Sequence, residues 1–69
     1  MNGNKNEKQN GFWINKKAKI EILKDAKRLI FTAFIVEIDE THITFIDRDG
    51  KTYSFNRELV KEMQYLGDA

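Results

Sequence analysis

The chain has 69 residues, no cysteine and a net charge of +1. This length allows one domain with a small core. The absence of cysteine excludes disulfide bridges, and a single His with no Cys excludes the usual zinc ligand sets. No apolar run reaches the roughly 18 residues that span a bilayer, and the polar N-terminus lacks the apolar segment of a signal peptide, so we expect a cytoplasmic protein.

Charge is unevenly distributed along the chain. Residues 1–28 contain eight Lys or Arg against three acids, whereas residues 29–69 contain four Lys or Arg against eight acids. A basic first part and an acidic second part could steer a polyanion to one side of the protein. The alternative interpretation is a solvated, lysine-rich strand that follows a loose tail.

Residues 1–10 are rich in Asn, Lys, Glu and Gln. They cannot bury apolar surface, so we expect a disordered polar tail ahead of a single domain at residues 11–69. That domain opens with an abrupt apolar cluster, Gly11-Phe12-Trp13-Ile14. Because large aromatic side chains are rarely left in water, the cluster predicts a short turn or helix that packs against either the end of the domain or another subunit.

Two strands are expected next. Residues 16–23 alternate, with Ala18, Ile20 and Ile22 on one side and mostly charged residues on the other, which is typical of a half-buried strand. A charged hairpin connection at residues 24–28 leads into the longest apolar run, residues 29–39, which is apolar on both sides. A long, bent central strand that contributes each half to a different wall of a small barrel would explain this pattern.

Two shorter strands are predicted at residues 42–47 and 51–55, separated by the strongest turn signal in the chain, Asp47-Arg48-Asp49-Gly50. The end of the chain allows two interpretations. Residues 56–66 form either a helix capped by Asn56, or one helical turn at residues 57–59 and a fifth strand at residues 60–66. We favour the turn and strand, because four strands would leave one face of the central strand uncovered.

The predicted fold is mainly β: a five-stranded, strongly bent antiparallel barrel of SH3-like or Sm-like type, with a short N-terminal turn or helix. Residues 19–23 and 31–39 resemble the first two strands of an Sm or Hfq protein, and residues 42–46 resemble the third. Residues 53–60 resemble the passage into the fifth strand, and Gln9-Asn10-Gly11-Phe12 is weakly similar to the start of the N-terminal helix of Hfq. The C-terminal barrel of the ribosome-maturation factor RimP has a similar pattern.

This resemblance implies a nucleic-acid-binding protein, RNA before DNA, with a post-transcriptional or regulatory role. Sm-like barrels associate by pairing their fourth and fifth strands between subunits, so it also implies a homo-oligomer. His42 and Arg57 match base-contacting positions, although His42 could instead bond within its turn and Arg57 could pair with Glu40 or Glu58. The candidate nucleic-acid-binding residues are Lys16, Lys17, Lys19, Lys24, Lys27, Arg28, His42 and Arg57. The candidate partner or oligomer surface consists of Phe12, Trp13, Tyr53, Phe55, Val60, Met63 and Tyr65.

A second functional interpretation is an SH3-like protein-interaction or regulatory module that does not bind nucleic acid. It would bind a protein through Phe12, Trp13 and an open strand edge. We expect no enzyme activity, cofactor or metal, because the single His and the single Ser, Ser54 in mid-strand, do not form a recognisable catalytic or ligand set.

Overall fold

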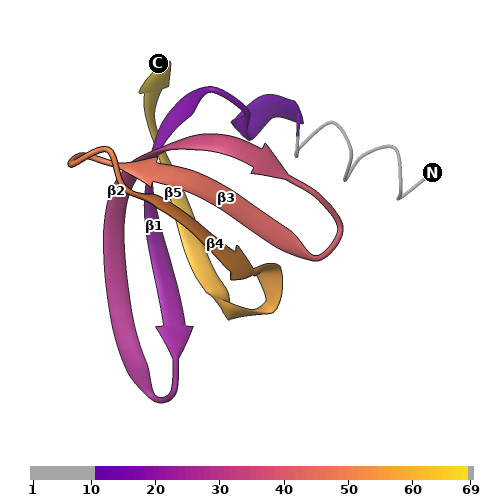
Figure 1. The fold of residues 1–69 in the computed structure, drawn as a ribbon, viewed down its shortest axis with the longest axis vertical. Coiled ribbons are helices and arrows are strands. Elements are labelled where there is room, and N and C mark those ends of the chain that lie inside the picture. Colours follow the sequence, from indigo (N-terminus) through magenta and orange to yellow (C-terminus); the bar gives the residue numbers. More distant parts are fainter. Residues whose placement is uncertain (1–10, 69) are drawn as a thin grey trace.

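The computed structural model describes residues 11–68, which form one antiparallel sheet of five strands. The strands are β1 (Lys16–Lys24), β2 (Lys27–Ile38), β3 (His42–Asp47), β4 (Thr52–Asn56) and β5 (Val60–Asp68), with a 3-10 turn, η1 (Arg57–Leu59), ahead of β5. Their order across the sheet is β4-β3-β2-β1-β5 (Figure 1). The prediction of a mainly β fold with five antiparallel strands is therefore confirmed. None of the helical segments in this part of the chain could span a membrane.

The central strand β2 changes partner along its length. Residues 27–34 pair with β1, and residues 33–38 pair with β3, so only Ala33 and Phe34 have partners on both sides. A register shift between Ile35 and Glu37 interrupts the second half, and such an extra residue bends a strand and increases its twist. In Figure 1 the β3–β4 pair accordingly runs at a marked angle to the β1–β2 hairpin.

The sheet does not close into the predicted barrel. Within residues 11–68, β4 and β5 are the two edges of the sheet and do not pair with each other. β4 has five residues against nine in β5, and the three-residue turn η1 leads β5 away to pair with β1. The short β4 therefore stops without a neighbour on its outer edge, and the sheet stays open.

The core lies on the inner face of this sheet. Alternate residues of β1, β2 and β3 point into it, as their two-residue periodicity requires. The fully buried residues are Ala18, Ile20, Ile22, Ala33, Ile35, Ile43 and Phe45. Nine further apolar side chains, among them Trp13, are half-buried against this cluster, so apolar surface from every strand contributes to the core.

Two local interpretations are resolved by the fold. Residues 57–59 form a single 3-10 turn followed by a strand, so the helix alternative for residues 56–66 is wrong. Asn56 does act as a cap, since its side-chain oxygen accepts a hydrogen bond of 2.8 Å from the Glu58 N–H. At the other end, residues 11–13 form a helical turn in which Trp13 is half-buried against the core while Phe12 is 48% exposed. The predicted tail at residues 1–10 lies outside the described residues.

Candidate functional site

The cations of the β1–β2 hairpin lie on both faces of the sheet. Lys17 and Lys19 alternate with the buried residues of β1 and therefore point to the outer face. Lys16 and Lys24 occupy the alternate positions of β1 that also hold its buried residues, so they lie on the inner face, at the two ends of the strand. Arg28 of β2 returns to the outer face. The predicted set of cations therefore does not form one continuous track.

Two of these cations are paired with acids. The Nε of Arg28 lies 3.0 Å from Oε2 of Glu21, and the Nζ of Lys16 lies 3.5 Å from Oδ1 of Asp68. These are the two ion pairs within residues 11–68. Each joins an exposed side chain, Arg28 or Asp68, to a half-buried one. Their contribution to stability is small, but each acid locally offsets the charge of its partner.

The remaining outer-face lysines differ in their surroundings. Lys19 lines a shallow hollow together with Glu21, Glu62 and Gln64, so nearby carboxylates reduce its attraction for an anion. Lys17 lies directly opposite Phe34 of β2 and makes no ion pair within the described part of the chain. Of these two lysines, Lys17 is the stronger candidate for an anion contact.

The tip of the hairpin is tighter than the sequence suggested. Lys24 and Lys27 are directly opposite each other, so only Asp25 and Ala26 connect the strands, both with positive φ angles of 52° and 64°. Like charges opposite each other on neighbouring strands repel. The Nζ of Lys24 lies 5.9 Å from the centroid of the Phe55 ring. The tip, at one corner of the molecule (Figure 1), therefore carries two opposed lysines with Asp25 in the turn between them.

His42 and Arg57 lie together at a different corner, around the β2–β3 turn. Asp39 organises this turn: its Oδ1 accepts hydrogen bonds from the Thr41 N–H at 2.8 Å, the His42 N–H at 2.7 Å and the Thr41 hydroxyl at 3.2 Å. The His42 N–H bond is the main reason that the pKa of Asp39 lies below its usual range, followed by the Thr41 N–H bond. Glu40 has no comparable role. Sequence reasoning missed Asp39, although an Asp two residues before Thr is a known turn signal.

Arg57 is attached to the same turn by its backbone and its side chain. Its N–H donates to the Thr41 carbonyl at 2.8 Å, and its Nη1 donates to the Asp39 carbonyl at 2.9 Å. The Arg57 side chain thus bonds to a backbone carbonyl rather than to Glu40 or Glu58. The Nδ1 of His42 lies 2.8 Å from the Thr41 hydroxyl oxygen. Which of the two groups donates in this contact depends on the tautomer of the His42 ring.

The predicted partner surface falls into two groups. Phe12 lies between Trp13 and Tyr65, with 5.3 Å between its ring centroid and each of theirs. The Tyr65 hydroxyl donates to Oδ1 of Asp68 at 3.0 Å, and this bond is the main reason that the pKa of Tyr65 is raised. Phe12 and Tyr65 are 48% and 46% exposed, so they form an aromatic patch beside the free edge of β5.

The second group lines the inner face beside the two free strand edges. Tyr53 and Phe55 of β4 stack in one aromatic cluster with Phe45 and also contact Phe31, with centroids 4.8 to 6.1 Å apart. Val60 and Met63 lie half-buried on the inner face of β5. Both edge strands therefore present half-buried apolar side chains and unpaired backbone groups.

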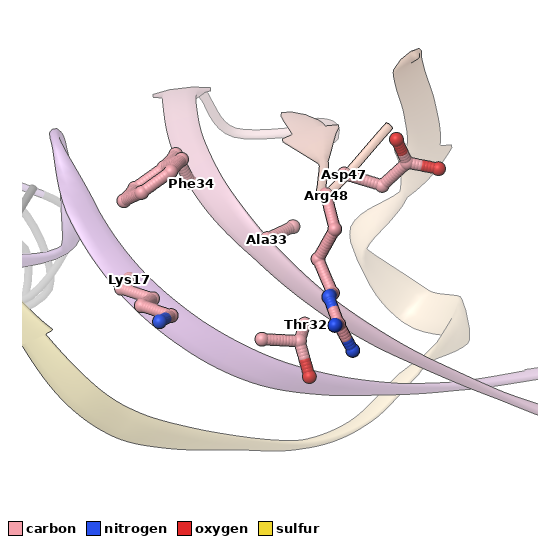
Figure 2. Close-up of a pocket in the computed structure, with 6 residues that line it drawn as sticks. All are labelled: Lys17, Thr32, Ala33, Phe34, Asp47 and Arg48. Carbon is pink, nitrogen blue, oxygen red and sulfur yellow. The ribbon is translucent and has the colours of Figure 1, made fainter. Parts of the chain in front are cut away.

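A hollow that the sequence did not predict lies on the outer face. Its volume is about 220 Å³, and its lining consists of Lys17, Thr32, Ala33, Phe34, Asp47 and Arg48 (Figure 2). The β3–β4 turn positions Arg48 over β2 because Asp47 fixes the turn: its Oδ1 accepts the Asp49 and Lys51 N–H groups, each at 2.9 Å. These bonds, that of Lys51 above all, lower the pKa of Asp47. The strong turn signal was the only indication that Arg48 would have a fixed place.

Residues 11–68 contain no group of three or more His, Asp or Glu side chains placed to hold a metal ion. In comparisons with known proteins, no family model, no curated protein and no solved structure matches the chain.

Proposed function

We propose that the chain is a non-enzymatic nucleic-acid-binding module of the Sm-like kind, which binds RNA in preference to DNA and acts as a homo-oligomer in a regulatory, post-transcriptional role. The observation that carries this proposal is the β1–β2 hairpin. Lys17, Lys24 and Lys27 make no ion pair within residues 11–68, and two of them lie directly opposite each other at the tip. Such a concentration of charge is relieved when a polyanion replaces the counterions.

The β2–β3 turn supplies a second candidate contact, Arg57 with His42, beside the Asp39 carboxylate. His42 begins β3 and Arg57 follows β4, so both lie at the open end of the β3–β4 hairpin, where hydrogen bonds hold them against the same turn. The Arg57 guanidinium uses one of its donors on Asp39, and the others can reach a phosphate or a base edge. The Sm-like resemblance assigns base contacts to these same two positions. They therefore support binding of RNA through its bases, and not only through its phosphates.

The open sheet supports the oligomer. An edge strand with unpaired backbone groups and apolar neighbours is a template for another strand. Pairing β4 of one copy with β5 of the next would cover Tyr53 and Phe55 with Val60 and Met63, and would extend the sheet across the interface. Because two different edges meet, the contact is head-to-tail, and copies related by rotation close into a ring.

The solution mass, measured by light scattering with and without a short uridine-rich RNA, tests both parts of this proposal. We expect a ring of about five to seven subunits whose mass increases by that of the RNA. A monomeric mass would contradict the proposed oligomer. A mass that does not change when RNA is added would contradict nucleic-acid binding. The double variant Lys24→Gln with Lys27→Gln is the matched control, since it should keep the ring and weaken RNA binding.

The aromatic patch favours a second candidate, a protein-interaction module. Phe12 and Tyr65 are nearly half exposed and lie beside the free edge of β5, where an extended peptide could add a strand and place an apolar side chain on the two rings. Retention on heparin at low salt separates the two functions. A nucleic-acid-binding protein is retained, and a module that binds only protein passes through.

A further inference from the structure

The outer face of β2 carries an exposed aromatic side chain next to two cations. Phe34 is 42% exposed at the middle of the sheet, between Lys17 on β1 and Ile46 on β3 as its direct cross-strand neighbours. Together with Lys17 and Arg48 it lines the hollow of about 220 Å³ (Figure 2). An accessible ring with basic groups beside it is the combination that single-stranded nucleic acids require.

The charges around the hollow leave both cations available. Neither Lys17 nor Arg48 forms an ion pair within residues 11–68. The nearest acid, Asp47, accepts two backbone N–H groups of its own turn, and Figure 2 shows its carboxylate turned away from the Arg48 guanidinium. An anion in the hollow would therefore meet two cations, while Asp47 is already bonded inside the turn.

A second hollow continues along β2 from the first. Its volume is about 150 Å³, and it shares Thr32, Asp47 and Arg48 with the first hollow. It extends to Phe31 and to Ile30, which is 49% exposed, and Asp49 is a second acid in its lining. Alternate residues of a strand share a face, so the same outer face continues from Ile30 to Arg28, whereas Lys24 and Lys27 at the tip lie on the inner face. The two hollows thus form a path along one strand.

We propose that this path binds single-stranded nucleic acid, with one base stacked on the Phe34 ring and the adjoining phosphates on Lys17 and Arg48. The strand then runs along the outer face of β2, past Ile30 toward Arg28. The inference rests on the proposed function and names a surface for it apart from the His42 and Arg57 turn. A peptide ligand would not need a ring and two cations at this spacing, whereas each nucleotide offers both a flat base and a phosphate.

The test is the affinity of two variants for a fluorescein-labelled uridine oligonucleotide of about twelve residues, measured by fluorescence anisotropy. Phe34→Leu removes the ring and should weaken binding about tenfold without changing the salt dependence. Arg48→Gln removes one phosphate contact and should reduce the slope of log K against log salt by about 0.7. Phe34→Trp keeps a stacking ring and should bind at least as tightly as the natural chain.

Two matched controls lie nearby. Val36→Ala truncates a 44% exposed apolar residue of β2 that lines neither hollow, and Lys51→Gln removes a cation that follows the same turn as Arg48. Neither should change the affinity by more than about twofold. Circular dichroism checks that each variant is folded.

The outcomes separate this site from the function on which it rests. Suppose that the natural chain binds the oligonucleotide and that Phe34→Leu and Arg48→Gln bind it with the same affinity. The proposed site is then wrong, while nucleic-acid binding itself stands. If the natural chain does not bind the oligonucleotide at low salt, the proposed function fails and the site fails with it. Loss of affinity in Phe34→Leu that Phe34→Trp does not restore would also contradict stacking.

Discussion

The Nη1 of Arg57 donates a hydrogen bond of 2.9 Å to the carbonyl oxygen of Asp39, which lies 18 residues earlier in the chain. This bond ties the turn before β5 to the turn before β3. The Arg57 N–H adds a second bond to the same turn, at the Thr41 carbonyl. Two loops that are distant in sequence are thereby fixed as one surface, and this surface carries His42.

Replacing Arg57 by Ala should lower the free energy of unfolding by about 1 kcal/mol, because one charge-assisted hydrogen bond between exposed groups is lost. Urea denaturation followed by circular dichroism measures the change. Arg57→Lys is the matched control: it keeps the charge for a phosphate but not the fork geometry. An Arg57→Ala variant with unchanged RNA affinity and unchanged salt dependence would show that Arg57 is not part of the proposed nucleic-acid contact.

Stability should decrease in acid through Asp39. The hydrogen bonds from His42 and Thr41 lower its pKa in the folded state, so their contribution is fully present above about pH 4, the unfolded value. It is lost as the pH falls through the folded pKa. Thermal unfolding at a series of pH values should show this decrease, and Asp39→Asn should reduce it.

The control for this acid effect is Asp49→Asn. The Asp49 carboxylate accepts no hydrogen bond within the described residues, so the substitution should leave the profile of melting temperature against pH unchanged. An Asp39→Asn profile with the same acid decrease as the natural chain would contradict the role of this turn.

Ala26 occupies a backbone conformation that suits glycine. The two-residue turn Asp25-Ala26 has positive φ at both positions, as in the type I′ hairpin turns that favour Asn-Gly. Ala26→Gly should therefore raise the free energy of unfolding by about 0.5 to 1 kcal/mol. Gly50→Ala is the reciprocal test. At φ 82° a Cβ on residue 50 would meet no atom within 4 Å. We therefore expect this variant to lose about 1 kcal/mol of unfolding free energy, and the loss would come from backbone strain and not from a steric clash.

The two faces of the sheet should respond differently to the same change. Ile20 is fully buried on β1, whereas Ile30 is 49% exposed on β2. Ile20→Val should cost about 1 kcal/mol, and Ile30→Val should stay within about 0.5 kcal/mol of the natural chain. Equal losses in the two variants would mean that the outer face of β2 is also covered, as it would be in an oligomer that buries this face.

The strands could be predicted because their signals are local. The alternation of Ala18, Ile20 and Ile22 and the turn at Asp47 to Gly50 each determine a short segment, and the structure has strands and a turn there. The change of partner along β2 agrees with the predicted bent central strand. The expectation that both apolar sides of this strand are covered is wrong, since Ile30, Phe34 and Val36 on its outer side are 42 to 49% exposed.

The open edge and the outer hollow could not be predicted in the same way. Whether β4 meets β5 depends on strand length and on the path of η1, which no hydrophobic pattern records. The hollow brings together Lys17, Phe34 and Arg48 from three elements. In the sequence Phe34 looks like core, because a strand that is apolar on both sides does not reveal which side stays exposed.

The most direct test of the nucleic-acid proposal is the affinity for a uridine-rich RNA measured by fluorescence anisotropy over a series of salt concentrations. Four cations without ion pairs in the described residues, Lys17, Lys24, Lys27 and Arg48, predict a slope of log K against log salt of about −3 per subunit contacted. A folded protein that binds no RNA at low salt, or binds it with no salt dependence, would contradict the account.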